Sequence, residues 1–348
     1  MAPCRPAAGL RHRAEPELIR SRLARLWLAL ACLLPPALAP AQPVAQPEAQ
    51  PQRAELIGTL RLTHDAPWFG GFSGIEMAPG GDAMLLISDR TRWARAMITR
   101  ENGVATQATG WNSLPILGPD GGPQPRGHGD SEGLARLPGG RICISYEGVP
   151  RVECHAGIRA PAEPLPGYAP FEKLGRNSAL EALAADGMGR LYTLPETTLD
   201  PEGLIPVWRW DGSRWSVVLQ LQDQRGFRPV GADVLDDHLY LLLRHFSPLG
   251  FNSRLLRVPL SGGTADLLLQ TGPGTHDNLE GLSVWRNADG DIIASMISDD
   301  NRNWFQRSEL VEYRLPEPPA RRDAAAALPP ERPAIAADAP LASRPRSQ

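Results

Sequence analysis

The sequence predicts an all-β fold, a β-propeller of five blades, and two observations lead to that prediction. From about residue 55 to 315, short apolar runs alternate with Gly, Asp, Asn and Pro, which is the pattern of strands joined by tight turns. Within this region an acid followed by an apolar run recurs five times, at Glu76, Glu132, Glu181, Asp233 and Glu280. Successive acids lie 56, 49, 52 and 47 residues apart. A period near fifty residues is typical of blade repeats.

Each repeat divides into four predicted strands, which run in order from the central channel outward. The first repeat gives strands 72–78, 83–89, 94–100 and 103–110. The third gives 179–185, 190–195, 206–210 and 215–221. The fourth gives 231–235, 238–244, 253–258 and 265–270. The second repeat carries the same acid and apolar run from Asp130 to Glu147.

The fifth repeat supplies only three strands, 279–285, 291–298 and 308–315. We expect the N-terminal strand 55–62 to pair with 308–315, because that pairing closes the ring and removes an exposed sheet edge. Residues 111–129 and 155–177 fit the repeat least well. A sixth, degenerate blade in either segment is the alternative.

The two ends of the chain differ from the repeats. Residues 1–41 contain arginines, a short apolar run at 26–34 and an Ala-x-Ala site before Gln42, which predicts a Sec-type signal peptide cleaved near Ala41. Lipidation at Cys32 is a less favoured alternative. Residues 42–54 predict a Pro/Gln linker, and 316–348 a disordered Pro/Ala/Arg tail. No later apolar run is long enough to cross a membrane, so we expect a periplasmic or secreted protein.

Charge and cysteines narrow the expected partners and compartment. The net charge of -3 gives no basic field, which argues against nucleic acid as a partner. We expect a monomer that acts on a small molecule.

Cys143 and Cys154 lie on two strand-like runs around a turn. In an oxidising compartment they form either a disulfide or a pair of small buried apolar residues.

The repeated acids predict a metal site at one end of the channel. Residues at the same point of each inner strand recur around that end, and we expect a second set, Asp89, Glu147, Glu196, Arg244 and Asp299, on the same face. Clustered carboxylates repel unless they bind protons or cations, and oxygen ligands favour Ca²⁺ or Mg²⁺. The candidate metal ligands are Glu76, Glu132, Glu181, Glu280, Asp299 and Asp300. The alternative is that each inner acid accepts backbone N–H bonds and ties neighbouring blades together.

The same motifs supply candidates for catalysis and substrate binding. The candidate catalytic residues are His276, Glu132, Glu280 and Asp299, with His276 able to act as general acid or base. The candidate substrate-binding residues are Arg90, Arg176, Asn177, Arg244, Asn278 and Asn301. His128 and His245 also lie at motif edges. The densest polar constellation follows His276, in the last repeat.

The ordered set of motifs resembles the phytase-like family, whose description is "esterase-like activity of phytase". The motifs are residues 72–76, 130–134, 176–177 with 180–183, 278–282 and 298–301. The resemblance covers roughly residues 55 to 315 and implies an exported bacterial propeller that hydrolyses an ester or phosphate ester. The fourth repeat departs from the pattern, because Asp233 and Arg244 replace the Glu and the second acid. A fully symmetric metal ring is therefore not expected.

These observations give one hypothesis and two alternatives. The hypothesis is an exported hydrolase of phosphate or carboxylic esters, assisted by a metal at one face of the channel. The first alternative is a non-catalytic periplasmic propeller that binds a small ligand or a protein partner, since a fold does not determine a function. The second is a lactonase-like metal hydrolase, which differs only in its substrate.

Overall fold

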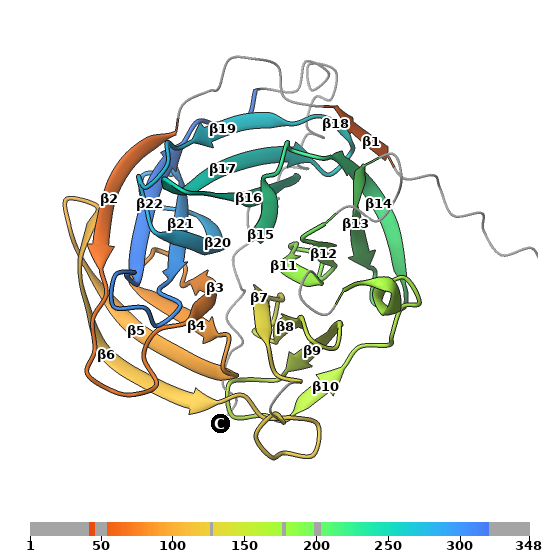
Figure 1. Cartoon of the computed structure of the whole chain (residues 1–348), viewed down its shortest axis with the longest axis horizontal. Coiled ribbons are helices and arrows are strands. Elements are labelled where there is room, and N and C mark those ends of the chain that lie inside the picture. Colours follow the sequence, from red (N-terminus) through yellow and green to blue (C-terminus); the bar gives the residue numbers. More distant parts are fainter. Residues whose placement is uncertain (1–41, 46–53, 126–127, 176–178, 198–202, 320–348) are drawn as a thin grey trace, which may run out of the picture.

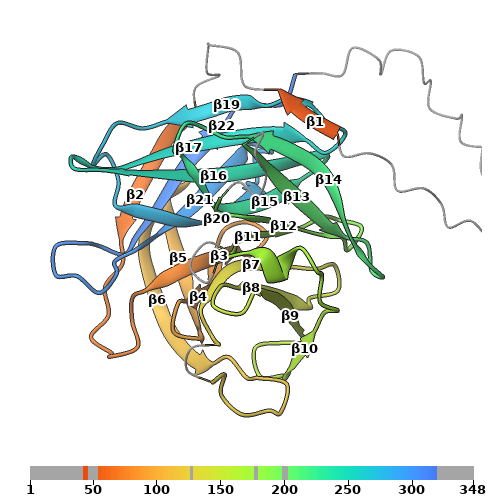
Figure 2. The same cartoon turned by 45° about the vertical axis from the view of Figure 1, so that its right-hand side comes forward.

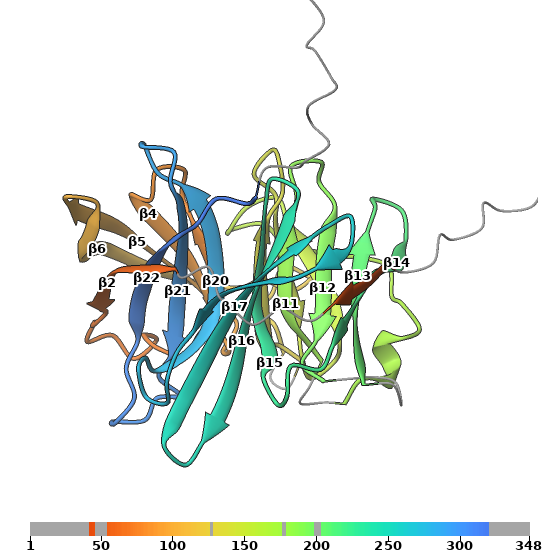
Figure 3. The ribbon, with the colours of Figure 1, turned by 90° about the horizontal axis from the view of Figure 1, so that it is seen from above.

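Five blades of antiparallel strands surround a central axis in the computed structural model of the chain (Figure 1). The model describes residues 42–45, 54–125, 128–175, 179–197 and 203–319. In this part of the chain the only helical element is a short 3₁₀ turn, Phe171–Lys173. The five-bladed all-β prediction is confirmed. Viewed from the edge, the inner strands run from one face of the disc to the other (Figure 3).

The first three blades follow the chain order from the channel outward. Blade one contains β3 (Phe72–Met77), β4 (Ala83–Ser88), β5 (Arg92–Glu101) and β6 (Val104–Pro115). Blade two contains β7 (Ser131–Arg136), β8 (Ile142–Tyr146), β9 (Arg151–His155) and β10 (Ala162–Pro164). Blade three contains β11 (Leu180–Ala185), β12 (Leu191–Pro195), β13 (Leu204–Trp210) and β14 (Trp215–Gln222). Within the segments 111–129 and 155–177, the described residues contribute the end of β6, the strand β10 and the 3₁₀ turn, and they form no sixth blade.

The last two blades complete the ring. Blade four contains β15 (Arg228–Leu235), β16 (His238–Ser247), β17 (Gly250–Pro259) and β19 (Asp266–Gln270). Blade five contains β20 (Asn278–Arg286), β21 (Ile292–Asp299), β22 (Glu309–Leu315) and β2 (Glu55–Arg61). The strand β2 pairs antiparallel with β22, with Leu60 opposite Leu310 (Figure 2). The predicted closure by the two ends of the domain is confirmed.

Four residues of the predicted linker form a strand instead. The strand β1 (Gln42–Ala45) runs parallel to β14 and to β18 (Gly263–Thr264) (Figure 1). The outer strand of a blade offers unpaired backbone groups, and β1 satisfies them on β14. The predicted signal peptide and most of the predicted tail, 320–348, lie outside the described residues.

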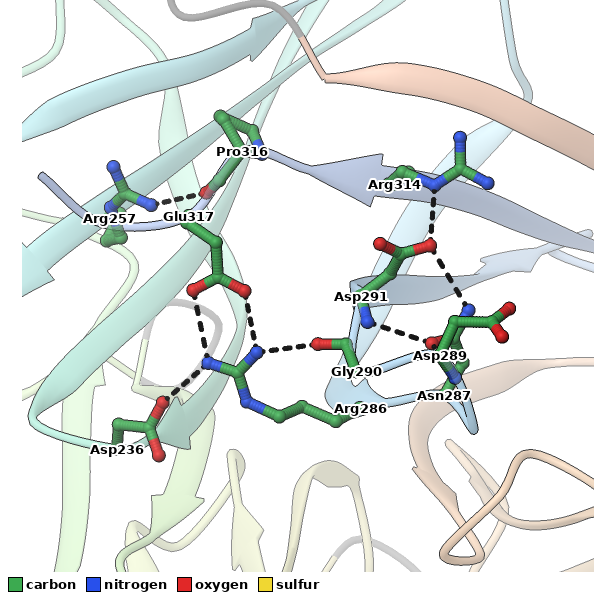
Figure 4. A network of polar contacts seen from close by, with 10 residues as sticks. All are labelled: Asp236, Arg257, Arg286, Asn287, Asp289, Gly290, Asp291, Arg314, Pro316 and Glu317. Atoms are coloured by element: carbon green, nitrogen blue, oxygen red, sulfur yellow. Dashed lines mark hydrogen bonds and ion pairs between the residues drawn. The ribbon is translucent and has the colours of Figure 1, made fainter.

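The first residues of the predicted tail are held by a polar network between blades four and five (Figure 4). Arg257 Nη1 donates to the carbonyl oxygen of Pro316 at 2.7 Å. Arg286 Nη1 donates to Glu317 Oε1 at 2.7 Å, and its Nη2 donates to Asp236 Oδ2 at 3.0 Å. The ordered domain therefore continues at least to Glu317.

The core lies between the blades, where the inner and second strands are almost fully buried. Strand β21 buries all of its residues, and β8 does so as well. Cys143 on β8 and Cys154 on β9 face each other across the strand pair, are fully buried and form a disulfide. Of the two alternatives for these cysteines, the structure therefore shows the disulfide, and the bridge lies inside the core. Among the described residues no helix is long and apolar enough to cross a membrane.

Candidate functional site

A β-bulge interrupts the inner strand of every blade at the same level. The pairing register shifts between Phe72 and Gly74 in blade one and at the matching points of the other four inner strands. A bulge leaves a residue unpaired and re-aims its side chain. The residues at this level are Ser73, Glu132, Glu181, Val230 and Glu280. Only blades two, three and five therefore present an inner-strand carboxylate there.

The predicted ring of five acids is wrong, because Glu76 and Asp233 lie three residues beyond the bulge of their strands. Glu76 Oε1 accepts a hydrogen bond from the backbone N–H of Arg136 in blade two at 2.9 Å. Asp233 Oδ2 accepts one from the backbone N–H of Val284 in blade five at 2.5 Å. Both acids therefore tie neighbouring blades together, as the structural alternative expected.

Glycine follows the bulge in four blades because the inner strands approach closely there. A Cβ on Gly133 would lie 2.5 Å from the backbone nitrogen of Leu183, and one on Gly231 would lie 2.4 Å from the carbonyl oxygen of Glu280. The space left between the strands at this level is about 10 Å³. The packed inner strands thus close the channel beneath the carboxylates.

Above this closed floor lies a cavity of about 280 Å³ that is lined entirely by charged residues and that we call the acid cavity. Its lining consists of eight acids and one arginine: Asp89, Asp130, Glu132, Glu147, Glu181, Glu196, Glu280, Asp299 and Arg244. The inner strands supply one set, and the ends of the second strands supply the other, so the predicted shared face is confirmed. The side chains of Arg244 and Glu196 are 22% and 21% exposed, so solvent reaches the cavity.

Burial and mutual repulsion disfavour the ionised carboxylates. Burial, followed by the charges of Glu181 and Glu280, raises the pKa of Glu132 well above its usual range. Burial raises the pKa of Asp89 to about 6. Burial together with Asp130 raises the pKa of Glu147 to about 7, and burial together with Glu280 raises that of Asp299 to about 8. Near neutral pH this cavity therefore retains protons or takes up cations.

Arg244 compensates the charge on one side of the acid cavity. Its guanidinium forms a hydrogen-bonded ion pair with Glu280, and its Nη2 lies 3.6 Å from Glu196 Oε1. Its Nη1 also donates to Asn278 Oδ1 at 2.9 Å, and Asn278 Nδ2 donates to Glu280 Oε1 at 2.7 Å. Arg244 and Asn278, both predicted to bind substrate, thus orient Glu280.

On the other side of the acid cavity, three carboxylates converge. Asp130, Glu132 and Glu147 each offer a carboxylate oxygen, and these three atoms lie within 4.8 Å of one another. Nearby, Asp89 Oδ1 is buried and accepts no hydrogen bond from the described residues. A donor set made only of carboxylate oxygens fits Ca²⁺ or Mg²⁺. Asp130 and Glu147 are not among the metal ligands predicted from the sequence, although Glu147 belongs to the predicted second set.

Three predicted residues of the last repeat do not line the acid cavity. His276 lies apart from it, and Asp300 and Asn301 form hydrogen bonds that hold loops beside it. His276 is buried, and its Nε2 is 2.7 Å from the hydroxyl of Tyr313. Asp300 Oδ1 accepts from the backbone N–H of Gly71 at 3.1 Å, and its Oδ2 accepts from Ser308 Oγ at 2.9 Å. Asn301 donates its backbone N–H to Asp299 Oδ1 at 2.8 Å, so it forms the turn that fixes Asp299.

The remaining predicted residues that the structure describes do not line the acid cavity. Arg90 is exposed and borders an adjoining cavity of about 670 Å³, which shares Asp89 and Asp130 with the acid cavity. His245 packs on the ring of Phe227, with ring centroids 5.3 Å apart, and His128 is exposed. Arg176 and Asn177 lie outside the described residues.

Comparison with known proteins gives one family match. The model of the family described as "Phytase-like: Esterase-like activity of phytase" matches residues 67–302. A search of curated proteins finds no match.

Two solved structures that are similar to this chain are distant in sequence. A PQQ-bound aldose sugar dehydrogenase from Streptomyces coelicolor is 13% identical, with a TM-score of 0.42 over 76% of this chain and 99% of that chain. The catalytic domain of a GH62 α-L-arabinofuranosidase from Coprinopsis cinerea is 12% identical, with a TM-score of 0.42 over 76% of this chain and 97% of that chain. Neither likeness carries an argument about activity.

Proposed function

The chain belongs to the phytase-like family, and from that premise we propose that it is an exported hydrolase of phosphate or carboxylic esters, assisted by a divalent cation in the acid cavity. The observation that carries the proposal is the lining of that cavity, where eight carboxylates face a single guanidinium. Blade ties require far fewer acids, and Glu76 and Asp233 already serve that purpose. Export follows from the signal peptide predicted within residues 1–41.

Asp130, Glu132 and Glu147 are the proposed metal ligands, and Ca²⁺ or Mg²⁺ is the proposed cation. When bound, such a cation polarises a phosphoryl or carbonyl oxygen and lowers the pKa of a bound water. The three ligands lie on the side of the cavity that Arg244 does not neutralise. The protein thus leaves uncompensated negative charge where the cation is needed.

Asp299 is the proposed proton donor. Its Oδ1 accepts the backbone N–H of Asn301, which leaves Oδ2 to carry the proton. Burial and Glu280 raise its pKa to about 8, so Oδ2 keeps a proton near neutral pH and can transfer it to a leaving oxygen. Arg244 and Asn278 hold Glu280 in place beside it.

The test is hydrolysis of p-nitrophenyl phosphate, p-nitrophenyl acetate and phytate by the purified protein, with Ca²⁺ and with a chelator. We expect turnover of at least one substrate that requires Ca²⁺ and is lost in the double variant Glu132→Gln/Glu280→Gln. Glu76→Gln is the matched control, because Glu76 is a half-buried inner-strand acid outside the acid cavity, as Glu132 and Glu280 are half-buried within it.

Failure of the hydrolysis test would favour one of the alternatives. Turnover no higher than that of the double variant, on esters and on lactones alike, would contradict the proposal and favour a non-catalytic propeller. Turnover of lactones alone would favour the lactonase-like alternative.

A further inference from the structure

Large apolar side chains are exposed on two neighbouring loops at the face of the disc that carries the acid cavity. Phe246, near the end of β16, is 68% exposed, and Leu249, in the turn between β16 and β17, is 79% exposed. Trp304 and Phe305, between β21 and β22, are 95% and 64% exposed. Seen from the edge, the β16–β17 hairpin extends beyond the neighbouring blades (Figure 3). Of the eight large apolar side chains exposed in the described part of the chain, half thus gather on these loops.

Between these two loops lies a cavity of about 430 Å³, which we call the aromatic pocket. The residues that define it are three aromatic side chains and three polar ones: Phe246, Phe251, Phe305, His276, Asp277 and Arg307. The rings of Phe246 and Phe251 lie 5.1 Å apart between centroids, and those of Trp304 and Phe305 lie 5.7 Å apart. The pocket therefore offers flat apolar surfaces together with a few polar groups, as small-molecule sites do.

The polar wall of the aromatic pocket is fixed by its own hydrogen bonds. Asp277 Oδ2 accepts the backbone N–H of Arg307 at 2.8 Å, and Asp277 Oδ1 accepts from Gln306 Nε2 at 3.3 Å. His276 is held by Tyr313, and burial and the nearby Arg307 lower its pKa, so the imidazole is neutral near pH 7. Among His276, Asp277 and Arg307, the polar residues of the pocket, Arg307 supplies the one partly exposed cation.

The aromatic pocket and the acid cavity are lined by close sequence neighbours on the same two segments of the chain. On β16, Arg244 lines the acid cavity, and Phe246, two residues later, lines the aromatic pocket. On the other side, Asp277 lines the aromatic pocket and Glu280 lines the acid cavity. Asn278 lies between these two acids and hydrogen-bonds Glu280 and Arg244. A ligand with a charged end and a flat apolar end can therefore occupy both sites.

We propose that the aromatic pocket binds the apolar group of the substrate, so that the preferred substrate is an ester or phosphate ester of an aromatic or similarly flat apolar group. This inference rests on the proposed function and deepens it. Burial of an apolar ring against Phe246, Phe251 and Phe305 favours binding, and stacked or edge-on rings add to it. A polyphosphorylated sugar alcohol has no such group and gains nothing from the pocket.

The test measures binding by calorimetry with two non-hydrolysable probes, 1-naphthylmethylphosphonate and methylphosphonate, in the presence of Ca²⁺. We expect Phe246→Ala and Phe305→Ala each to weaken binding of the naphthyl probe by about tenfold and to leave the methyl probe unchanged. Both side chains are exposed, so their removal should not unfold the protein. Met188→Ala is the matched control, because Met188 is 71% exposed on the turn between β11 and β12, at the other face.

The outcomes separate this inference from the proposed function. Selective loss of naphthyl binding without hydrolysis of any ester would support the pocket and contradict the hydrolase. Hydrolysis with unchanged naphthyl affinity in both Phe variants would overturn the pocket. Loss of binding to phosphatidylcholine vesicles in these variants, with unchanged naphthyl affinity, would also overturn it and assign the loops to a lipid surface. With an active enzyme, we expect KM for 1-naphthyl phosphate to rise while kcat is kept.

Discussion

Arg244 of blade four forms an ion pair with Glu280 of blade five at the edge of a cavity that eight carboxylates line. The pair joins two blades and supplies the one cation among the lining residues. We expect Arg244→Gln to lower the free energy of unfolding of the metal-free protein on the order of 3 kcal/mol, because the half-buried carboxylate of Glu280 loses its partner. Thermal melting with a chelator and with Ca²⁺ measures the effect.

Added Ca²⁺ should restore much of the stability that Arg244→Gln removes. Arg314→Gln is the control, since Arg314 pairs on the surface with Glu55, and exposed pairs contribute little. Equal melting temperatures for the wild type and Arg244→Gln in chelator would contradict the role assigned to the arginine.

The raised pKa values of the acid cavity predict a pH-dependent stability. The folded protein keeps protons on Asp89, Glu147 and Asp299 up to pH values of about 6, 7 and 8, whereas the unfolded chain releases them near pH 4. Since the folded state binds more protons in this window, the metal-free protein should lose stability as pH rises from about 4 to about 8. Urea unfolding at pH 5 and pH 8 in chelator measures the loss.

Ca²⁺ should reduce this pH dependence, because it replaces the protons at high pH. The stabilisation by Ca²⁺ should accordingly be larger at pH 8 than at pH 5. If the metal-free protein instead becomes more stable as pH rises from 5 to 8, its carboxylates are not held in the protonated form.

The three acids of blade two predict a specific pattern of metal binding. Asp130→Asn and Glu132→Gln should each weaken Ca²⁺ binding by at least about tenfold, because each removes one charged oxygen ligand. Asp233→Asn should leave the affinity unchanged, since Asp233 bonds backbone N–H groups away from the cavity. Calorimetric titration with Ca²⁺ measures all three variants. Equal losses in all of them would mean that overall charge, and not the ligand set, decides affinity.

The close approach of the inner strands at Gly231 predicts strong intolerance of a side chain. Gly231→Ala should destabilise the protein by roughly 1–3 kcal/mol, because its Cβ would meet the carbonyl oxygen of Glu280 at 2.4 Å. Gly187→Ala is the matched control, because nothing lies within 4 Å of its added Cβ. Urea unfolding compares the two variants, and a similar midpoint for both would contradict the packing described.

The disulfide predicts a further stability difference. Replacing Cys143 and Cys154 together by alanine should lower the free energy of unfolding by about 3 kcal/mol, because the bridge restricts a loop with a sequence separation of 11 in the unfolded chain. Reduction with dithiothreitol should lower the unfolding midpoint of the wild type and leave that of the double variant unchanged. Equal stability of the oxidised wild type and the double variant would contradict this.

Much of the fold follows from local signals in the sequence. The fifty-residue period, the turn residues and the short apolar runs predict five blades, and the incomplete last repeat predicts that strand 55–62 closes the ring. These signals are local in the sequence or depend on counting strands, so they can be recognised without knowing how the blades pack. The same signals place the second set of charged residues, such as Glu147 and Asp299, on the face of the inner-strand acids.

The acid cavity itself depends on register, which the sequence does not reveal. Glu76 and Asp233 lie only three residues from the position of Glu132 and Glu280 in their repeats, and a linear pattern does not separate the two positions. The bulge decides which side chains converge above the closed channel.

The sequence by itself therefore determined the propeller, the pairing that closes its ring and the clustering of acidic residues at one face. Tertiary structure alone decided that Glu147 joins Asp130 and Glu132, that His276 lies against the hydroxyl of Tyr313, and that Phe246 and Phe305 line one pocket. The physical reason is that these contacts join loops of different strands or blades, whose relative positions are set by strand pairing and blade packing.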